Sequence, residues 1–341
     1  MRIERLRAVQ PRSAADPPGW RTTLGQILVA VDTDQGVQGL GVGGGGAAGI
    51  HVVEQVLQPL LAGARVESVD DIAHLWERMY RETVPFGRKG VVLMAISGVD
   101  LALWDALGKR EGISVARLLG ERPRERVPCY ATTNAPEAAV AQGFRAVKLS
   151  AGADDEETVI RRAAQTRERI GPNVQLFLDA GWHWDLGRSL RAAAALARYG
   201  VGWLEEPLPP DDLAGYAALA RQSPVPIAGG EHEYTVHGFR ELAAHRAHAI
   251  WQPDVCWTGG MTQLRAIYAL AASEGVRVVP HRGSEVWGLH AIAALDPEPL
   301  AESGRPWLTW LEGQPPITGG EIELPDRPGF GVRVDPGLLG A

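Results

Sequence analysis

The chain has 341 residues, a length that at roughly 100–200 residues per domain corresponds to about two or three domains, or to one large barrel with an addition. Hydrophobic residues make up 45% of it and charged residues 22%, a balance that excludes a disordered chain, a coiled coil and a collagen. The formal net charge of −7 argues against a nucleic-acid binder, which should be basic.

Cysteine content and apolar runs narrow the class further. Only two cysteines occur, too few for a disulfide framework or for a zinc site built from cysteines. The N-terminus does not resemble a signal peptide, and no apolar run approaches the roughly 20 residues of a membrane span. We therefore expect a cytoplasmic protein with neither a membrane nor a nucleic acid as its partner.

The first 125 residues predict an α+β domain. Alternating or apolar runs predict strands over residues 3–9, 26–32 and 37–42. Asp34-Gln35-Gly36, a hairpin turn signal, separates the last two strands. Helical periodicity follows over residues 50–61, 69–80 and 89–108. The third helix is apolar almost all round, which predicts that it is buried between two layers.

From residue 126 onwards one unit repeats, in which a short apolar run ends in a polar or charged residue and a helical stretch follows. The eight runs span residues 127–132, 144–150, 174–180, 201–207, 225–231, 249–254, 277–281 and 307–312. Strands that alternate with helices predict a parallel sheet, and eight such units predict a (β/α)8-type barrel over residues 126–313. The predicted fold class is therefore α/β, with an α+β capping domain over residues 1–125. We expect residues 314–341, rich in Pro and Gly, to pack back on that domain.

Seven of the predicted strands end in an ionisable side chain, and the strand ends of a barrel converge on one mouth. These residues are Lys148, Asp179, Glu205, Glu231, Asp254, His281 and Glu312. The acids of three consecutive strands, Asp179, Glu205 and Glu231, would repel one another there without a cation. Ligation by oxygen alone favours Mg²⁺, with Mn²⁺ as a substitute.

The runs SGVDLALWDALGK, LDAGWHWD, WLEEP, GGEHEYT, QPDVCWTGGMT and VVPH carry a family resemblance that covers essentially the whole chain. In order and spacing they resemble the enolase superfamily, in its mandelate racemase/muconate lactonizing enzyme family. The resemblance implies Mg²⁺ held by Asp179, Glu205 and Glu231, with Glu205 rather than Glu206 as the second ligand. Within the family, GGEHEYT, QPDVCWTGGMT and PHRGSEVWGLH look closest to rhamnonate-dehydratase-like acid-sugar dehydratases.

The reaction implied by the resemblance removes a proton next to a carboxylate and leaves a dianionic enediolate. Lys148, beside the substrate carboxylate, and Mg²⁺ would stabilise the developing charge. His281 is the best candidate base because an imidazole titrates near neutral pH. Asp254, in an implied Asp254–His281 dyad, would fix the tautomer of that ring. We expect Glu312 to donate a proton or a hydrogen bond to a substrate oxygen.

The second strand departs from the racemases of this branch, which carry Lys-x-Lys there. This sequence has Lys148-Leu149-Ser150, and Ser150 cannot act as a general base without a partner. With one base left, elimination is favoured, and we expect an acid-sugar (aldonate) dehydratase that gives a 2-keto-3-deoxy acid. Two alternatives remain open. One is an epimerase or racemase that uses Ser150 or His232 as its second base, and the other is a non-catalytic sugar-acid-binding protein.

The remaining expectations concern the substrate. His232 is either a substrate contact or a turn residue, and Ser150 and Trp182 are candidate substrate contacts. Trp184 and Trp257 either wall the pocket or pack in the core. The family resemblance implies that two loops of the capping domain, here residues 11–23 and 41–51, set specificity. The expected partner is a small-molecule sugar acid, and we expect a homo-oligomer.

Overall fold

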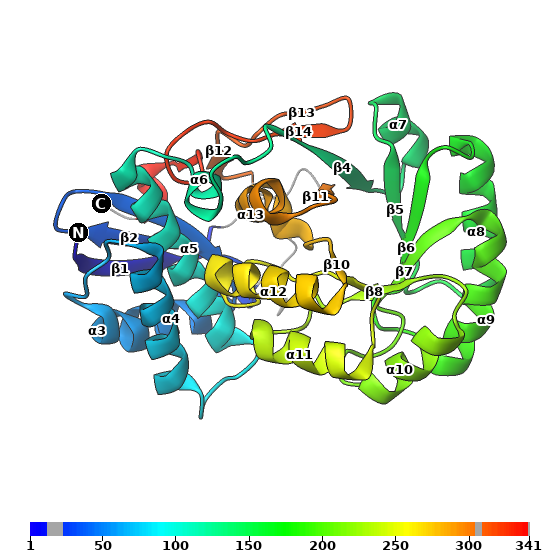
Figure 1. The fold of residues 1–341 in the computed structure, drawn as a ribbon, viewed down its shortest axis with the longest axis horizontal. Helices are drawn as coiled ribbons and strands as arrows, with labels where there is room; N and C mark the ends of the chain where they lie inside the picture. The colour runs from blue at the N-terminus through cyan, green and yellow to red at the C-terminus, as the bar shows by residue number, and fades with distance from the viewer. Residues whose placement is uncertain (12–22, 304–308, 340–341) are drawn as a thin grey trace.

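The computed structural model describes residues 1–11, 23–303 and 309–339 of the chain. An N-terminal domain of antiparallel strands and helices lies beside a domain in which parallel strands alternate with helices (Figure 1). This is the α/β architecture with a capping domain that the sequence predicts.

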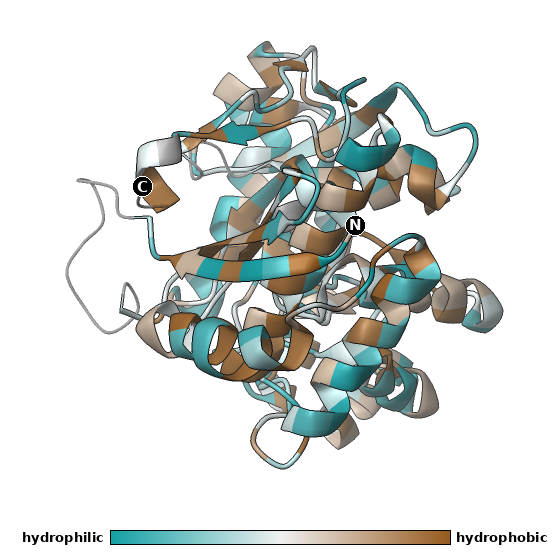
Figure 2. Cartoon of the chain, turned by 90° about the vertical axis from the view of Figure 1, so that its left-hand side faces the viewer, coloured by the Kyte–Doolittle hydropathy of each residue, from teal (hydrophilic) through white to brown (hydrophobic). Residues whose placement is uncertain are grey.

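The N-terminal domain is built on an antiparallel sheet of β1 (Ile3–Val9), β2 (Ile27–Thr33) and β3 (Gln38–Gly43). β2 and β3 form the hairpin that the turn signal predicts, with Asp32 opposite Gln38. Hydrophobic and hydrophilic residues mix along β1, whose apolar side chains are the buried ones (Figure 2). The edge strand β1 therefore has one buried face, whereas β2 and β3 are buried on both faces.

The helices of this domain cover that sheet. They are α2 (Gly46–His51), η1 (Val52–Leu57), α3 (Gln58–Leu61), α4 (Val69–Thr83), α5 (Val91–Glu111) and α6 (Val115–Leu119). α5 lies close to β3, because a Cβ on Gly39 or Gly41 would stand 1.9 or 2.2 Å from backbone oxygens of α5. α5 has the length and apolar character of a membrane-spanning helix, but 83% of its apolar window is buried inside the protein. It is the core helix that the sequence predicts.

The second domain contains eight strands joined by parallel pairing, in the spatial order β10-β9-β8-β7-β6-β5-β4-β11. They are β4 (Arg126–Thr132), β5 (Ala146–Ser150), β6 (Gln175–Asp179), β7 (Val201–Glu205), β8 (Ile227–Gly229), β9 (Ile250–Trp251), β10 (Arg277–Val278) and β11 (Ala301–Ser303). Their helices are α7 (Pro136–Ala141), α8 (Glu156–Ile170), α9 (Leu186–Leu196), η2 (Ala197–Tyr199), α10 (Leu213–Gln222), α11 (Thr235–His245), α12 (Gly260–Glu274), η3 (Arg282–Glu285) and α13 (Trp287–Leu295). The arrangement is a barrel-type fold.

The prediction of the eighth strand over residues 307–312 is wrong. The strand that pairs with β4 is β11, and Glu302 lies opposite Tyr130. Part of the predicted run, residues 304–308, lies outside the described residues, and Leu311–Glu312 forms β12, which pairs with β15 (Arg333–Val334). The physical reason is that a three-residue strand with a central acid has too few residues to show an apolar pattern, whereas residues 307–312 form a longer apolar run.

The C-terminal segment contacts both domains. β13 (Ile317–Thr318) and β14 (Glu321–Glu323) form a hairpin, and β14 adds antiparallel to β4 of the barrel. Further on, the Phe330 amide donates to the Asp105 carboxylate of α5, at 2.8 Å, and the Arg7 guanidinium of β1 donates to the carbonyl of Leu339 in η4 (Pro336–Leu339), at 3.2 Å. The segment thus ties the capping domain to the first barrel strand.

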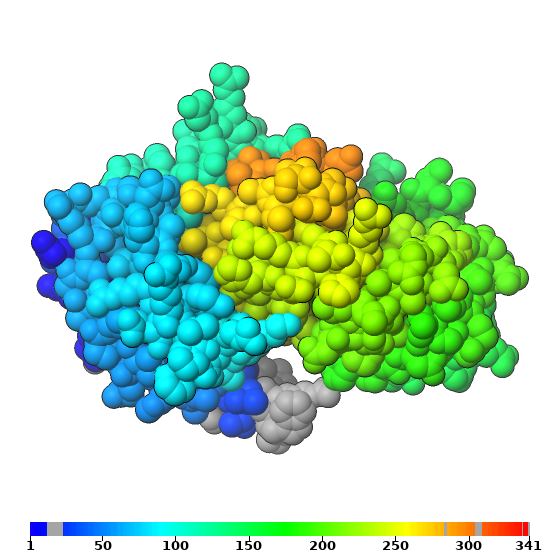
Figure 3. All heavy atoms as spheres, turned by 60° about the horizontal axis from the view of Figure 1, so that its bottom comes forward, coloured from blue at the N-terminus to red at the C-terminus, as the bar shows by residue number. Residues whose placement is uncertain are grey.

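The barrel has a packed aromatic interior, and hydrogen bonds join it to the capping domain. Inside the barrel, Phe177 stacks on Trp203 with ring centroids 3.4 Å apart, so the interior is a packed core. Between the domains, the Asp100 carboxylate of α5 accepts hydrogen bonds from the amide (3.0 Å) and the hydroxyl (2.5 Å) of Thr262 in α12. The two domains are in close contact over this region (Figure 3).

Candidate active site

Six of the seven ionisable residues predicted at strand ends gather at one edge of the parallel sheet, and Glu312 does not. Ser150, Asp179 and Glu205 lie opposite one another in register on β5, β6 and β7. Beyond β8, β9 and β10 the backbones continue side by side. The His281 amide, for example, donates to the Pro253 carbonyl at 3.1 Å. Glu231, Asp254 and His281 stand on these extensions, because parallel strands present all their carboxyl ends at one edge.

Lys148 lies buried between two acids at the centre of this edge. Its ammonium nitrogen is 2.5 Å from Glu205 Oε1 and 3.0 Å from Glu302 Oε1. Burial alone would lower the pKa of Lys148, but the negative charges of Glu205 and Glu302 outweigh burial and raise it well above its usual value. The residue is therefore a fixed positive charge in the mouth.

Glu302 is the acid of the eighth strand, and the prediction of Glu312 for that position is wrong. Burial would raise the pKa of Glu302, but the charges of Lys148 and His281 lower it to about 2. The Thr132 hydroxyl (2.5 Å) and the Arg282 amide (3.0 Å) also donate to this carboxylate. Glu312 is exposed on β12, away from the parallel strands. The signal that could have found Glu302 was its spacing, since it follows His281 by about one strand–helix repeat.

His281 and Asp254 form the predicted dyad. His281 Nδ1 lies 3.0 Å from Asp254 Oδ2, and the other oxygen of Asp254 accepts the Cys256 amide at 2.8 Å. On its opposite side, His281 Nε2 lies 3.2 Å from Glu231 Oε2. Burial lowers the pKa of His281, but the negative charges of Glu231 and Asp254 outweigh it and raise the pKa to about 10. A cation bound by Glu231 would cancel part of that charge and bring the imidazole pKa back towards neutrality.

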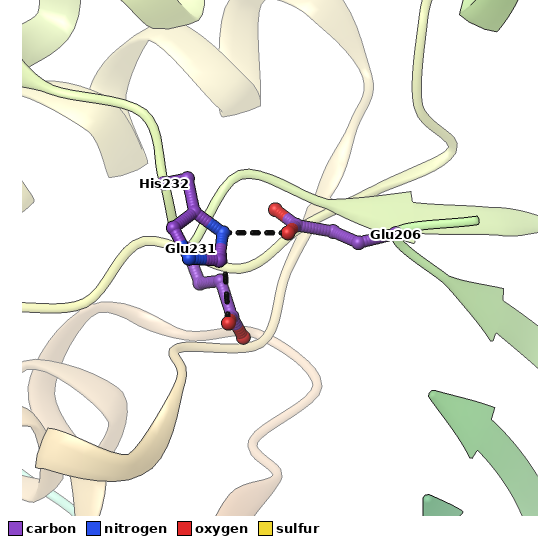
Figure 4. Close-up of side chains that lie close together, drawn as sticks. All are labelled: Glu206, Glu231 and His232. Carbon is purple, nitrogen blue, oxygen red and sulfur yellow. Dashed lines mark hydrogen bonds and ion pairs between the residues drawn. The ribbon is translucent and has the colours of Figure 1, made fainter. Parts of the chain in front are cut away.

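His232 bridges Glu206, which follows β7, and Glu231, its neighbour in the loop after β8. Its Nδ1 lies 2.6 Å from Glu206 Oε2 and 3.6 Å from Glu231 Oε1 (Figure 4). The other oxygen of Glu206 accepts the Gly230 amide at 3.1 Å. Within the described part of the chain, Glu206, Glu231 and His232 are the set whose ligand atoms lie within 4.8 Å of one another.

Two sets of residues could therefore hold a metal, and both include Glu231. Glu206 is already satisfied by His232 and the Gly230 amide, and its pKa is lowered, because these partners outweigh its burial. Glu205 also has partners, since it accepts hydrogen bonds from Lys148, the Trp203 indole (3.1 Å) and the Gln252 side-chain amide (2.7 Å), but its pKa is shifted in the other direction. Burial and the charges of Asp179, Glu302 and Glu231 raise its pKa to about 8, although Lys148 opposes them.

Several acids crowded together on neighbouring strands, as Asp179, Glu205 and Glu231 are, form an environment that a hard cation stabilises. The oxygen-only set of Asp179, Glu205 and Glu231 fits Mg²⁺, which prefers oxygen to the ring nitrogen of the other set. Among the described residues, the ligand atoms of these three carboxylates do not all lie within 4.8 Å of one another, as those of the histidine set do.

Aromatic side chains surround the two histidines. Trp182 is 43% exposed, stacks on His183 at 4.9 Å, and meets His232 edge-on at 6.1 Å. The ring centroid of Trp257 lies 5.9 Å from that of His232 and 6.0 Å from that of His281. The backbone of Trp182 has a positive φ of 54°, which is unusual for a large side chain. A hydrogen bond from the Trp182 amide to the Glu206 backbone carbonyl stabilises this conformation. These two tryptophans line the mouth.

The other candidate contacts divide. Trp184 is buried and packs under the Arg188 guanidinium, 4.5 Å away, so it belongs to the core. Ser150 is exposed at the end of β5. The loop predicted over 11–23 lies outside the described residues from 12 to 22, and the loop over 41–51 contains the end of β3 and α2.

Both domains match known families. Residues 131–338 match the family described as enolase C-terminal domain-like, and residues 17–120 match the mandelate racemase/muconate lactonizing enzyme N-terminal domain. The chain belongs to the enolase superfamily. Within it, the chain is a member of the mandelate racemase/muconate lactonizing enzyme family, and the resemblance drawn from the motifs is confirmed.

Two relatives are named as L-rhamnonate dehydratases, one of them as putative. The L-rhamnonate dehydratase of Saccharopolyspora erythraea is 40% identical over 92% of this chain and 84% of its own. The putative L-rhamnonate dehydratase of Caldivirga maquilingensis is 35% identical over 97% of this chain and 87% of its own.

Solved structures of the superfamily are similar over nearly the whole chain. The 3,6-anhydro-D-galactonate cycloisomerase of Zobellia galactanivorans has a TM-score of 0.89, with 29% identity over 98% of this chain and 97% of its own. The Mg-complexed rhamnonate dehydratase of Gibberella zeae also has a TM-score of 0.89, with 29% identity, and covers 99% and 95%. The L-talarate dehydratase of Polaromonas, complexed with Mg and L-glucarate, has a TM-score of 0.83, with 31% identity, and covers 92% and 90%. This protein is an enzyme of the superfamily, a carbon–oxygen lyase.

Proposed function

We propose that the protein is a magnesium-dependent dehydratase of acid sugars. It removes the proton next to the carboxylate of an aldonate and eliminates the β-hydroxyl as water, which gives a 2-keto-3-deoxy sugar acid. The observation that carries the proposal is the position of His281, backed by Asp254 at 3.0 Å and facing a mouth that also holds buried Lys148. Similarity to rhamnonate and talarate dehydratases supports acid sugars as the substrate class.

The cofactor is magnesium, and Asp179, Glu205 and Glu231 are the residues proposed to hold it. When bound, it stabilises the negative charge that develops on the substrate carboxylate. Lys148 supplies a further fixed positive charge for that carboxylate, because its raised pKa keeps it protonated.

Proton transfer is assigned to His281. Its Nε2 takes the α-proton as the C–H bond breaks, and Asp254 holds Nδ1–H and stabilises the imidazolium. The electron pair then expels the β-hydroxyl, which leaves as water with the proton returned by Nε2, and the enol product tautomerises to the keto acid. Glu302, held by Thr132 and by the Arg282 amide, is placed to hydrogen-bond a substrate oxygen.

One observation favours a second candidate function, epimerisation. An epimerase needs a base on each face of the substrate carbon, and His232 has a carboxylate partner in Glu206, as His281 has in Asp254. Of the two bases considered from the sequence, His232 is therefore the stronger candidate, since Ser150 has no such partner described in the structure.

The experiment is a screen of aldonates and aldarates for 2-keto acid formation, followed by the reaction of the best substrate in D2O with proton NMR. A dehydratase forms the 2-keto-3-deoxy acid, and no C2 epimer accumulates. Rapid C2 deuteration with inversion, and no keto acid, would refute the dehydratase and establish the epimerase.

A further inference from the structure

We infer that Lys89, in the capping-domain segment that leads into α5, is a positioning residue for the barrel loop that carries Glu231 and His232. Lys89 Nζ lies 2.9 Å from the carboxylate of Glu233, which follows His232 in that loop. The inference rests on the proposed role of Glu231 as a metal ligand. It concerns a contact between domains that the reaction itself does not use.

Glu233 is a buried carboxylate with a site shaped around it. Its side chain is 8% exposed, and its Oε1 accepts the Tyr234 amide at 2.8 Å. The carboxylate lies against Gly238 in the first turn of α11, where an added Cβ would stand 2.1 Å from Oε1. In the described ranges, Lys89 is the cation recorded within ion-pair distance of Glu233. Since a buried carboxylate without a partner is strongly destabilising, Lys89 determines whether Glu233 keeps this position.

A second contact joins the same two segments. The hydroxyl of Tyr234, which is 8% exposed, is hydrogen-bonded by the backbone of Gly90, the residue after Lys89. The segment before α5 and the α11 region lie side by side in both views (Figures 1 and 3). Two adjacent capping-domain residues thus hold two adjacent residues of the barrel loop.

The loop is also held at its other end. The Gly230 amide donates to Glu206 Oε1 at 3.1 Å. Between these anchors stand Glu231, whose carboxylate is 3.2 Å from His281 Nε2, and His232. A shift at Glu233 is transmitted over only two peptide units to Glu231. The capping domain therefore sets the position of a proposed metal ligand through the ion pair between Lys89 and Glu233.

The test compares Lys89→Met with Arg88→Met. Both substitutions remove one exposed positive charge from neighbouring positions of the same segment, so they differ in the contact with Glu233. Magnesium affinity is measured by calorimetry on chelator-treated protein titrated with MgCl₂. Lys89→Met should weaken Mg²⁺ binding about tenfold, in the range seen for residues that orient metal ligands, and Arg88→Met should leave it unchanged.

Two further variants separate positioning from folding. Lys89→Arg keeps the charge and should recover most of the affinity. Glu233→Gln should weaken Mg²⁺ binding, and adding Lys89→Met to it should cause little further loss, because the two residues act as one pair. Equal Mg²⁺ affinity of Lys89→Met and Arg88→Met would overturn the inference, as would a lower Tm with unchanged affinity. These readouts need no substrate, so an absence of dehydratase activity would count against the proposed function alone.

Discussion

At the scale of single residues, the neighbours Glu205 and Glu206 have opposite environments. Glu205 pairs with Lys148 but lies among several other carboxylates, and its pKa is raised. Glu206 is hydrogen-bonded by His232 and the Gly230 amide, and its pKa is lowered. Glu205→Gln should weaken Mg²⁺ binding far more than Glu206→Gln, in calorimetric titrations of chelator-treated enzyme. The opposite ranking would assign the metal to the set that contains His232.

Chelation should abolish turnover of the wild type, and Mg²⁺ should restore it.

The dyad has a prediction of its own. His281→Asn should lower kcat by about 10³-fold or more, because it removes the base, and Asp254→Asn should lower it by a smaller but still large factor. Steady-state kinetics with the acid sugar found in the screen measures both. Near-normal turnover of His281→Asn would mean that another residue takes the proton, and His232 would be tested next.

Glu302 and Glu312 form a matched pair, because one is buried between Lys148 and Thr132 and the other is exposed on β12. Glu302→Gln should reduce kcat by roughly 10²-fold, since it removes a charged hydrogen-bonding partner from the mouth. Glu312→Gln should behave as the wild type in the same assay. Loss of activity in Glu312→Gln with normal Glu302→Gln would restore the prediction made from the sequence.

At the scale of elements, His290 of α13 joins three segments. Its Nδ1 accepts the Ala116 amide of α6 at 3.1 Å, and its Nε2 donates to the Phe330 carbonyl at 3.4 Å. The imidazole must therefore stay neutral, and burial lowers its pKa to about 4 from an ordinary 6.5. Between pH 6.5 and pH 4, His290 is protonated in the unfolded chain but neutral in the folded protein. The contribution of neutral His290 to the free energy of unfolding is therefore complete above pH 6.5 and is lost as the pH falls towards 4.

This linkage gives a pH prediction. Between pH 7 and pH 5, protonation of the unfolded His290 should lower the free energy of unfolding by about 2 kcal/mol. Urea titrations at both pH values, on the wild type and on His290→Gln, measure the effect as a difference in slope with pH. An identical pH dependence in the two proteins would show that His290 does not titrate between these states.

At the scale of the whole molecule, the contacts between the domains are buried and hydrogen-bonded. Asp100 binds the start of α12, and the Trp76 indole donates to the Gly259 carbonyl at 2.8 Å. We therefore expect the capping domain and the barrel to unfold together. Tryptophan fluorescence and far-UV circular dichroism should give coincident urea transitions. Two separate transitions would contradict this expectation.

The homo-oligomer expected from the sequence stays a prediction, and light scattering of the native protein would measure it.

The sequence by itself determined the repeat, the family and most of the site. The strands of its strand–helix units end at or next to Lys148, Asp179, Glu205, Glu231, Asp254 and His281. Parallel pairing necessarily brings such strand ends to one edge. Periodicity over long segments survives in the fold, as α5 illustrates, because burial on all sides requires apolar residues on all sides.

Only the tertiary structure decided what depends on single contacts. β11 is three residues long, so pairing with β4, and not any local pattern, makes it the eighth strand and puts Glu302 beside Lys148. The contrast between Glu205 and Glu206 arises from partners that are 24 to 57 residues away in sequence. The Lys89–Glu233 pair spans 144 residues and two domains. Such contacts leave no periodic signal, because their energy depends on distance in space and not on spacing along the chain.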